Sequence, residues 1–331
     1  MVESADQKQR RAWWRSTLIS SILASLTQLA LFTVVLVCPD SSMPSLLPLS
    51  AVALLVVIAS GRCCKRRLRV RASAPAFVFF SIIFIWGVYI GVVRQVISLL
   101  MDIAVNSELL MLFIGLCCIM SVDPGHIKND SSHLNELLES QALASEGPSE
   151  ESVPSSWDMP YELAAQEISV PLQRIRYCRQ CKAYVKGFDH HCPAFGNCIG
   201  QKNHVLFITL LFGFVVTEAS YIACSSQFTT KTQTLDKTGE QASLSRNLAV
   251  STMLFSLLQM LWQVVFLAWH IYCICFNIRT DEWIHWNRYP EFHLNVQPEP
   301  GQTSSATETR FINPYDKGIF LNVKEFLTAK G

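Results

Sequence analysis

Long stretches without a charged residue place the strongest constraint on how this chain can fold. Thr17 to Val37 is a run of 21 residues that contains no Asp, Glu, Lys or Arg. About 20 apolar residues in a helix cross a hydrocarbon core of about 30 Å. Half of the 331 residues are hydrophobic, which is too apolar for an ordinary soluble protein. The run is longer than the core of a secretory signal, so we expect an uncleaved first membrane span.

Five further apolar runs predict five more spans. They cover about Pro44 to Ser60, Ala76 to Val93, Ile103 to Val122, Val205 to Cys224 and Leu248 to Asn277. The fourth of the six spans is the weakest, because Asn106 and Glu108 fall in its first turns. With six spans, 23 of the 27 Lys and Arg residues lie on the side of the N-terminus. Basic residues mark cytosolic loops, so both termini and the segment between the fourth and fifth spans are predicted to be cytosolic.

These spans divide the chain into five parts. Residues 1–125 hold the N-terminal segment and four transmembrane helices, and residues 126–170 are rich in Ser and Glu, as in a flexible cytosolic linker. Residues 171–203 form a cysteine-rich domain, residues 204–278 hold the last two transmembrane helices, and residues 279–331 form a cytosolic tail. The predicted fold is an all-α polytopic membrane protein of about six transmembrane helices, with a small cytosolic zinc-binding domain between the fourth and fifth.

The cysteine-rich domain is recognised by the stretch from Tyr177 to Gly200, which holds four of the twelve cysteines and two of the eight histidines. A structural zinc takes four N or S ligands, so six candidates leave two over. If residues 188–193 run extended, His190 and Cys192 share one face while His191 turns to the other. We therefore expect His190 and Cys192 to be free and the metal to have four ligands: Cys178, Cys181, His191 and Cys198.

The two free residues suit nucleophilic catalysis. Free cysteine has a pKa near ~8.5, and only its thiolate attacks. His190 can take the proton of Cys192, and the Asp189 carboxylate can orient His190. The alternative is a plain zinc site in which His190 and Cys192 have no chemical role, which a short Cys/His pattern by itself would favour. The surplus of ligands and the neighbouring membrane spans favour catalysis.

The run Asp189-His190-His191-Cys192-Pro193, continued by Asn197-Cys198-Ile199-Gly200 and Asn203, resembles the DHHC-type protein S-acyltransferases, the palmitoyltransferases. The resemblance implies that Cys192 attacks the thioester of a long-chain acyl-CoA, such as palmitoyl-CoA, and passes the acyl chain to a cysteine of a membrane-associated protein substrate. It implies that His190 is the general base, Asp189 its partner and His191 a zinc ligand. The expected partners are acyl-CoA, protein substrates and the lipid bilayer of the endomembrane system (Golgi or ER) or the plasma membrane. No nucleic-acid partner is expected.

Three other segments are similar to motifs of the same family. Asp123-Pro124-Gly125 resembles its D-P-G motif, although proline and glycine end a helix in any protein. Arg279-Thr280-Asp281-Glu282 resembles its T-T-x-E motif with the first threonine replaced. That resemblance implies a hydrogen bond between Thr280 and the neighbourhood of Asp189, and a bracing role for Glu282. The segment from Asn313 to Asn322 resembles a C-terminal motif that returns to the membrane or the helix bundle; an ordinary surface helix is the alternative.

The chain also departs from the family pattern. The family usually binds two zinc ions, and the four ligands of its first site correspond to Ala164, Glu167, Tyr177 and Tyr184 here. The resemblance therefore implies one zinc ion, with Tyr177 and Tyr184 packing where the other would lie. Ala194 stands where the family most often has tryptophan.

The sequence leaves two other functions open. A catalytically weak DHHC-like membrane adaptor would keep the fold after the loss of one zinc site. A transporter or channel would need more polar residues in its spans than Glu218, Gln259, Gln263 and His270. Glu218 and His270 can line an acyl cavity or can serve as polar partners inside the bundle.

Overall fold

The computed structural model describes residues 5–39, 41–68, 72–127, 174–234, 240–296 and 308–328. Within this part of the chain, six helices are long and apolar enough to cross a membrane. They are α1 (Ala5–Val37), α2 (Met43–Leu68), α3 (Ala74–Gly91), α4 (Leu99–Ser121), α7 (His204–Thr234) and α8 (Glu240–Cys275). The predicted all-α polytopic membrane fold is confirmed, and the uncertain fourth span is a continuous helix.

Polar residues in the first turns of α4 are paired inside the bundle. Asp102 is buried and accepts hydrogen bonds from the Tyr89 hydroxyl (3.1 Å), Arg94 Nε (3.0 Å) and Asn106 Nδ2 (3.0 Å). The Trp86 indole N–H donates to Asn106 Oδ1 at 3.0 Å. Buried polar groups cost free energy unless they are hydrogen-bonded, so this network explains why α4 tolerates them.

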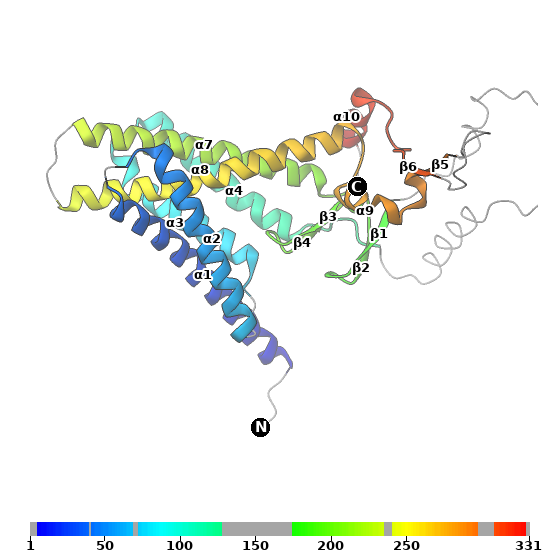
Figure 1. Ribbon diagram of the computed structural model, residues 1–331, viewed down its shortest axis with the longest axis horizontal. Coiled ribbons are helices and arrows are strands. Elements are labelled where there is room, and N and C mark those ends of the chain that lie inside the picture. The colour runs from blue at the N-terminus through cyan, green and yellow to red at the C-terminus, as the bar shows by residue number, and fades with distance from the viewer. Residues whose placement is uncertain are drawn as a thin grey trace, which may run out of the picture.

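The helices form one bundle from which the first two diverge. α7 packs against both α8 and α4, while α1 contacts α2, α3 and α8. Figure 1 shows α1 and α2 running together away from the other helices toward the N-terminus. Ser73 caps α3, because its hydroxyl accepts a hydrogen bond from Ala76 N. Ser20 of α1 donates to the carbonyl of Ser73 at 2.7 Å, which joins α1 to the start of α3.

The cysteine-rich segment lies between α4 and α7 and consists of two antiparallel hairpins. One pairs β1 (Ile175–Cys178) with β2 (Ala183–Lys186), and the other pairs β3 (His190–Cys192) with β4 (Asn197–Ile199). The start of the expected linker is ordered, because Ile127 N donates to Tyr184 O at 3.0 Å and so adds to the edge of β2. Residues 128–170, the rest of that linker, and residues 171–173 lie outside the described residues.

The tail after α8 packs beside the hairpins at one end of the bundle (Figure 1). It contains α9 (Thr280–His285), the short 3₁₀ helices Trp286–Arg288 and Pro290–Phe292, and the strands β5 (His293–Val296) and β6 (Glu308–Phe311), followed by α10 (Ile319–Thr328). The sequence did not predict the β5–β6 pairing. Asn322 of α10 is buried and donates to the carbonyl of Cys275 at 2.8 Å. This segment therefore returns to the end of α8.

Candidate metal centre and active site

The structure brings together the four residues that the sequence predicts to be metal ligands. His191 Nδ1 lies 3.4 Å from Cys181 Sγ, 3.6 Å from Cys198 Sγ and 3.7 Å from Cys178 Sγ. The Cys181 and Cys198 sulfurs are 3.4 Å apart, too far for a disulfide bond. Zn–S bonds of about 2.3 Å and Zn–N bonds of about 2.0 Å place the ligand atoms of a tetrahedral site about 3.5–3.8 Å apart. The cluster can therefore hold one metal ion of this kind.

The hairpins explain how these ligands meet. Cys178 ends β1, and a tight turn with Lys182 at a φ of 54° brings Cys181 back toward it. His191 and Cys198 are direct partners across β3 and β4. Burial raises the pKa values of the Cys181 and Cys198 thiols, and a cation among them would offset this effect by stabilising the thiolates.

Two tyrosines occupy the first hairpin where the resemblance implies a lost zinc site. Tyr177 and Tyr184 are direct cross-strand partners, and their ring centroids are 5.1 Å apart. An aromatic pair of this kind contributes roughly 0.5–1.5 kcal/mol beyond its buried area. The predicted packing of Tyr177 on Tyr184 is present in the structure. Ala164 and Glu167, the other two positions, lie outside the described residues.

The second face of β3 carries the candidate nucleophile and base. His190 Nδ1 donates to Asp189 Oδ2 at 2.7 Å, so Nε2 is the nitrogen that exchanges a proton with a neighbouring group. Burial alone would lower the pKa of His190, but hydrogen bonds to Asp189 and Cys192 outweigh it and raise the pKa to about 9. Cys192 is buried and packs on the apolar core between α3, α4 and α7. A base and a thiol thus meet where the hairpins join the membrane helices.

Asp189 is fully buried and is held by the segment that follows α8. Thr280 N donates to Asp189 Oδ1 and Asp281 N donates to the Asp189 carbonyl, both at 3.0 Å. The contact expected from Thr280 is therefore made by its backbone. Burial by itself would raise the pKa of Asp189, but the surrounding histidines, His204 and His190 foremost, hold it below its usual range.

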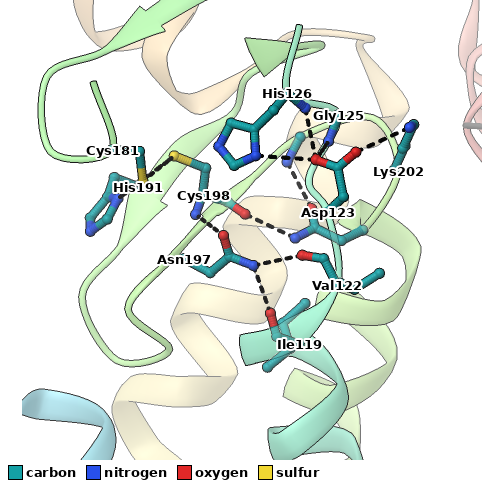
Figure 2. Close-up of polar contacts among 12 residues, drawn as sticks. Ile119, Val122, Asp123, Gly125, His126, Cys181, His191, Asn197, Cys198 and Lys202 are labelled. Carbon is teal, nitrogen blue, oxygen red and sulfur yellow. Dashed lines mark hydrogen bonds and ion pairs between the residues drawn. The ribbon is translucent and has the colours of Figure 1, made fainter. Parts of the chain in front are cut away.

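The end of α4 is fastened to β4 by one side chain, Asn197, to which the sequence pattern gave no role of its own. Asn197 Nδ2 donates to the carbonyls of Ile119 and Val122, both at 2.9 Å, while its Oδ1 accepts from Cys198 N at 2.8 Å (Figure 2). The last carbonyls of a helix have no partner within it. Asn197 therefore caps a membrane helix and holds the backbone of a candidate metal ligand at the same time.

The Asp123-Pro124-Gly125 segment docks on the same hairpins. Asp123 Oδ1 accepts from Gly125 N at 3.0 Å, and Oδ2 pairs with Lys202 Nζ at 3.1 Å (Figure 2). The pKa of Asp123 falls to about 2, because backbone and Lys202 hydrogen bonds outweigh the effect of burial. A Cβ at Gly200 would lie 2.5 Å from the Pro124 carbonyl oxygen, so only glycine allows this close approach. The segment thus does more than end a helix.

An ion pair joins the tail to the first hairpin, and the sequence predicted the role of only one of its two residues. Glu282 is buried and its Oε1 lies 3.0 Å from Arg174 Nε, so it does brace this domain. Its partner was not foreseen. The Arg174 guanidinium also stacks on the Tyr315 ring, with 3.6 Å from Cζ to the ring centroid, and Nη1 donates to Asn277 Oδ1 at 2.7 Å. No local pattern marks Arg174, because the partners of its side chain named here each lie more than 100 residues away.

The bundle encloses a cavity of about 60 Å³ between α3, α4, α7 and α8. Most of its lining is apolar, with Ile82 and Leu112 among the side chains, and Glu218 and Gln259 add polar groups. Glu218 Oε1 accepts from Gln263 Nε2 at 3.1 Å. His270 lies elsewhere, fully buried against Phe266 and with Nδ1 4.0 Å from Asp189 Oδ2. Of these two intramembrane residues, Glu218 lines the cavity and His270 belongs to the candidate active site.

Comparison with known proteins agrees with this site. Residues 165–287 match the DHHC palmitoyltransferase family. The chain is 29% identical over 162 residues to palmitoyltransferase ZDHHC17 of mouse (Mus musculus), a match that covers 46% of this chain and 24% of that protein. It is 26% identical over 237 residues to human palmitoyltransferase ZDHHC12, covering 68% and 71% of the two chains. Palmitoyltransferase AKR1 of Yarrowia lipolytica is 27% identical over 173 residues, covering 51% and 22%. The match thus spans only about a quarter of the length of ZDHHC17.

Proposed function

We propose that this chain transfers a long-chain acyl group from acyl-CoA to cysteines of membrane-associated proteins, because residues 165–287 match the DHHC palmitoyltransferase family. Before the first step His190 holds the proton of Cys192, in line with its raised pKa of about 9, and the Cys192 sulfur then attacks the thioester carbonyl. The bond from the carbonyl carbon to the CoA sulfur breaks, and CoA leaves with the proton from His190. In the second step, a substrate thiol attacks the acyl group on Cys192, its proton passes by way of His190, and Cys192 is released as a thiol.

The observation that carries this proposal is the position of Cys192. It lies beside His190, which Asp189 orients through a 2.7 Å hydrogen bond, and on top of the apolar core of the bundle. General-base help of this kind contributes roughly 10² to 10⁴-fold in rate. An acyl chain on Cys192 would extend from the reacting sulfur directly into apolar surroundings. Each buried CH₂ contributes about 0.8 kcal/mol relative to water.

We assign a structural role to a single zinc ion held by Cys178, Cys181, His191 and Cys198. It would cross-link the two hairpins and so fix the strand that carries His190 and Cys192. The His191 pKa is lowered by burial and by the neighbouring His190, which keeps the imidazole neutral as a ligand must be. The metal takes no part in the chemical steps.

The proposal places the hairpins, both termini and Cys192 on the cytosolic side of the membrane, in support of which 23 of 27 basic residues lie on that side. The cavity between α3, α4, α7 and α8 is lined mostly by apolar side chains, so it can take up part of an acyl chain.

The test is formation of an acyl-enzyme by the purified full-length protein with labelled palmitoyl-CoA. We expect label that hydroxylamine removes and that Cys192→Ser abolishes. Cys117→Ser, at an exposed position of α4, is the matched control and should label as the wild type does. Absence of hydroxylamine-sensitive label in a folded protein would favour the catalytically weak adaptor. Label on Cys192 that never passes to a protein substrate would contradict the second step.

A further inference from the structure

A second and larger hollow lies between α1, α2 and α3. Its volume is about 620 Å³, and it runs along α1 from Ile19 to Thr33. At 1.5 Å per residue this is about 21 Å, which is longer than half of a hydrocarbon core of about 30 Å. The groove therefore has the length of a lipid tail in one leaflet.

The walls of this groove offer almost no hydrogen bonds. Most of the lining is aliphatic, as at Leu23 and Val56. The hydroxyls of Thr27 and Thr33 both donate to carbonyls of their own helix, at 2.8 Å. A ligand in this part of the groove must accordingly be apolar along its length.

A basic residue lies at one end of the groove. Arg62 and Ala72 both line it, and they flank the connection from α2 to α3. Six of the ten residues from 62 to 71 are Lys or Arg. The opposite end, at Thr33, has no charged residue in its lining. A long apolar groove with a cationic residue at one end is complementary to a molecule with an anionic head and a hydrocarbon tail.

We propose that this groove binds one anionic phospholipid from the leaflet on the side of the two termini. Its phosphate head lies beside Arg62, and one acyl tail follows α1 toward Thr33. A tail gains little by leaving other tails for an apolar protein surface, so the head decides the selectivity. Each basic residue near a membrane surface favours an anionic lipid by about fivefold. The proposal concerns lipid binding only and stands independently of the acyl transfer.

The groove also touches the candidate acyl cavity. Phe77 of α3 lines both hollows, so the two hollows are neighbours. A lipid in the groove would support this wall from outside. The two N-terminal helices thus have a function that the cysteine-rich domain does not supply.

The test uses the full-length protein in neutral detergent, titrated with phosphatidylserine or phosphatidylcholine, with bound lipids counted by native mass spectrometry. We expect one saturable phosphatidylserine site, at least fivefold tighter than for phosphatidylcholine. Arg62→Gln should reduce that preference by about fivefold. Ala30→Phe, which places a ring in the groove, should abolish the saturable site. Inorganic phosphate should not compete, because it has no tail.

Two matched controls lie outside the groove. Lys324→Gln removes an exposed cation on α10, and Ala59→Phe adds a ring on an exposed face of α2; both should bind phosphatidylserine as the wild type does. Equal affinity for the two lipids, or unchanged binding by Arg62→Gln, would overturn the proposal. If Ala30→Phe failed to fold, Arg62→Gln would still test the proposal, because this substitution leaves the shape of the groove unchanged.

Discussion

Asp189 has the most demanding position of any side chain in the candidate site. Its carboxylate is fully buried, and its two oxygens are used by different parts of the chain: His190 on one side and the backbone N–H of Thr280 on the other. A buried carboxylate is unfavourable unless it is well paired. The position of His190 relative to Cys192 therefore depends on how Asp189 is held.

Replacing Asp189 with Asn tests this dependence with almost no change in shape. The amide can still accept from Thr280 N, but it loses the charge that favours a protonated His190 during the proton transfer. We expect Asp189→Asn to slow formation of the acyl-enzyme by about 10² to 10⁴-fold, measured by rapid-quench labelling with palmitoyl-CoA. Bound metal should remain at the wild-type level.

Asp281→Asn is the control for this substitution. Asp281 lies in the same segment, but its carboxylate pairs with His285 and Tyr289, away from His190. We expect it to label within a few-fold of the wild-type rate. If Asp189→Asn were as fast as Asp281→Asn, Asp189 would have no role in orienting the base.

At the scale of elements, β3 shows what a local pattern predicts well. A two-residue period puts His190 and Cys192 on one face and His191 on the other, and the structure has this arrangement. The length and charge of the apolar runs likewise predicted six helices. The pairing of β5 with β6 lacks a comparable signal, because no short turn motif in the sequence joins Val296 to Glu308.

Contacts between distant elements were harder to foresee. Asn197 in β4 reaches the end of α4, 75 and 78 residues earlier in the chain. Arg174 meets Glu282 across an even larger separation. Such pairs form only when folded helices and strands pack together, so no period or short motif in the sequence identifies both partners.

The structure of the two hairpins predicts how many zinc ions each chain holds. We expect one zinc per chain by atomic emission on the purified protein, because the described hairpins have one cluster of four N and S ligands and a tyrosine pair in the other place. A structural zinc contributes roughly 10–16 kcal/mol to folding of a small metal domain. Cys178→Ala or Cys198→Ala should therefore lose both the metal and the fold of the hairpins.

Cys224→Ala serves as the control, since Cys224 is buried in the bundle outside the cluster. It should keep one zinc. A content of two zinc ions in the wild type would mean that the tyrosine pair does not replace a site and that other residues bind metal.

For the whole molecule, the bundle and the cysteine-rich domain have to act as one unit. The apolar core is continuous from Cys192 and Phe195 through Phe207 to residues deep in the bundle. His204, the first residue of α7, lies near Asp189. Glu218 comes 14 residues later on the same helix, which is about 21 Å further into the membrane. A chain bound to Cys192 and extending along α7 would therefore end near Glu218.

This geometry predicts that Glu218 limits the length of the acyl chain. A longer chain must place its apolar end against the buried carboxylate and its Gln263 partner, which is costly. We expect Glu218→Leu to shift acyl-enzyme formation toward longer acyl-CoA substrates, measured as competition between chains that differ by two carbons. One buried CH₂ is worth about 0.8 kcal/mol, so the shift should be at most about fourfold per CH₂.

Glu108→Leu makes the same chemical change on α4, where Glu108 pairs with Ser220 outside the cavity lining. Its chain-length preference should match that of the wild type. An equal shift in both variants would mean that general loosening of the bundle, and not the end of the cavity, sets the preference. A shift in Glu218→Leu alone would place the far end of the acyl chain beside that residue, and would therefore locate the path that the chain follows from Cys192.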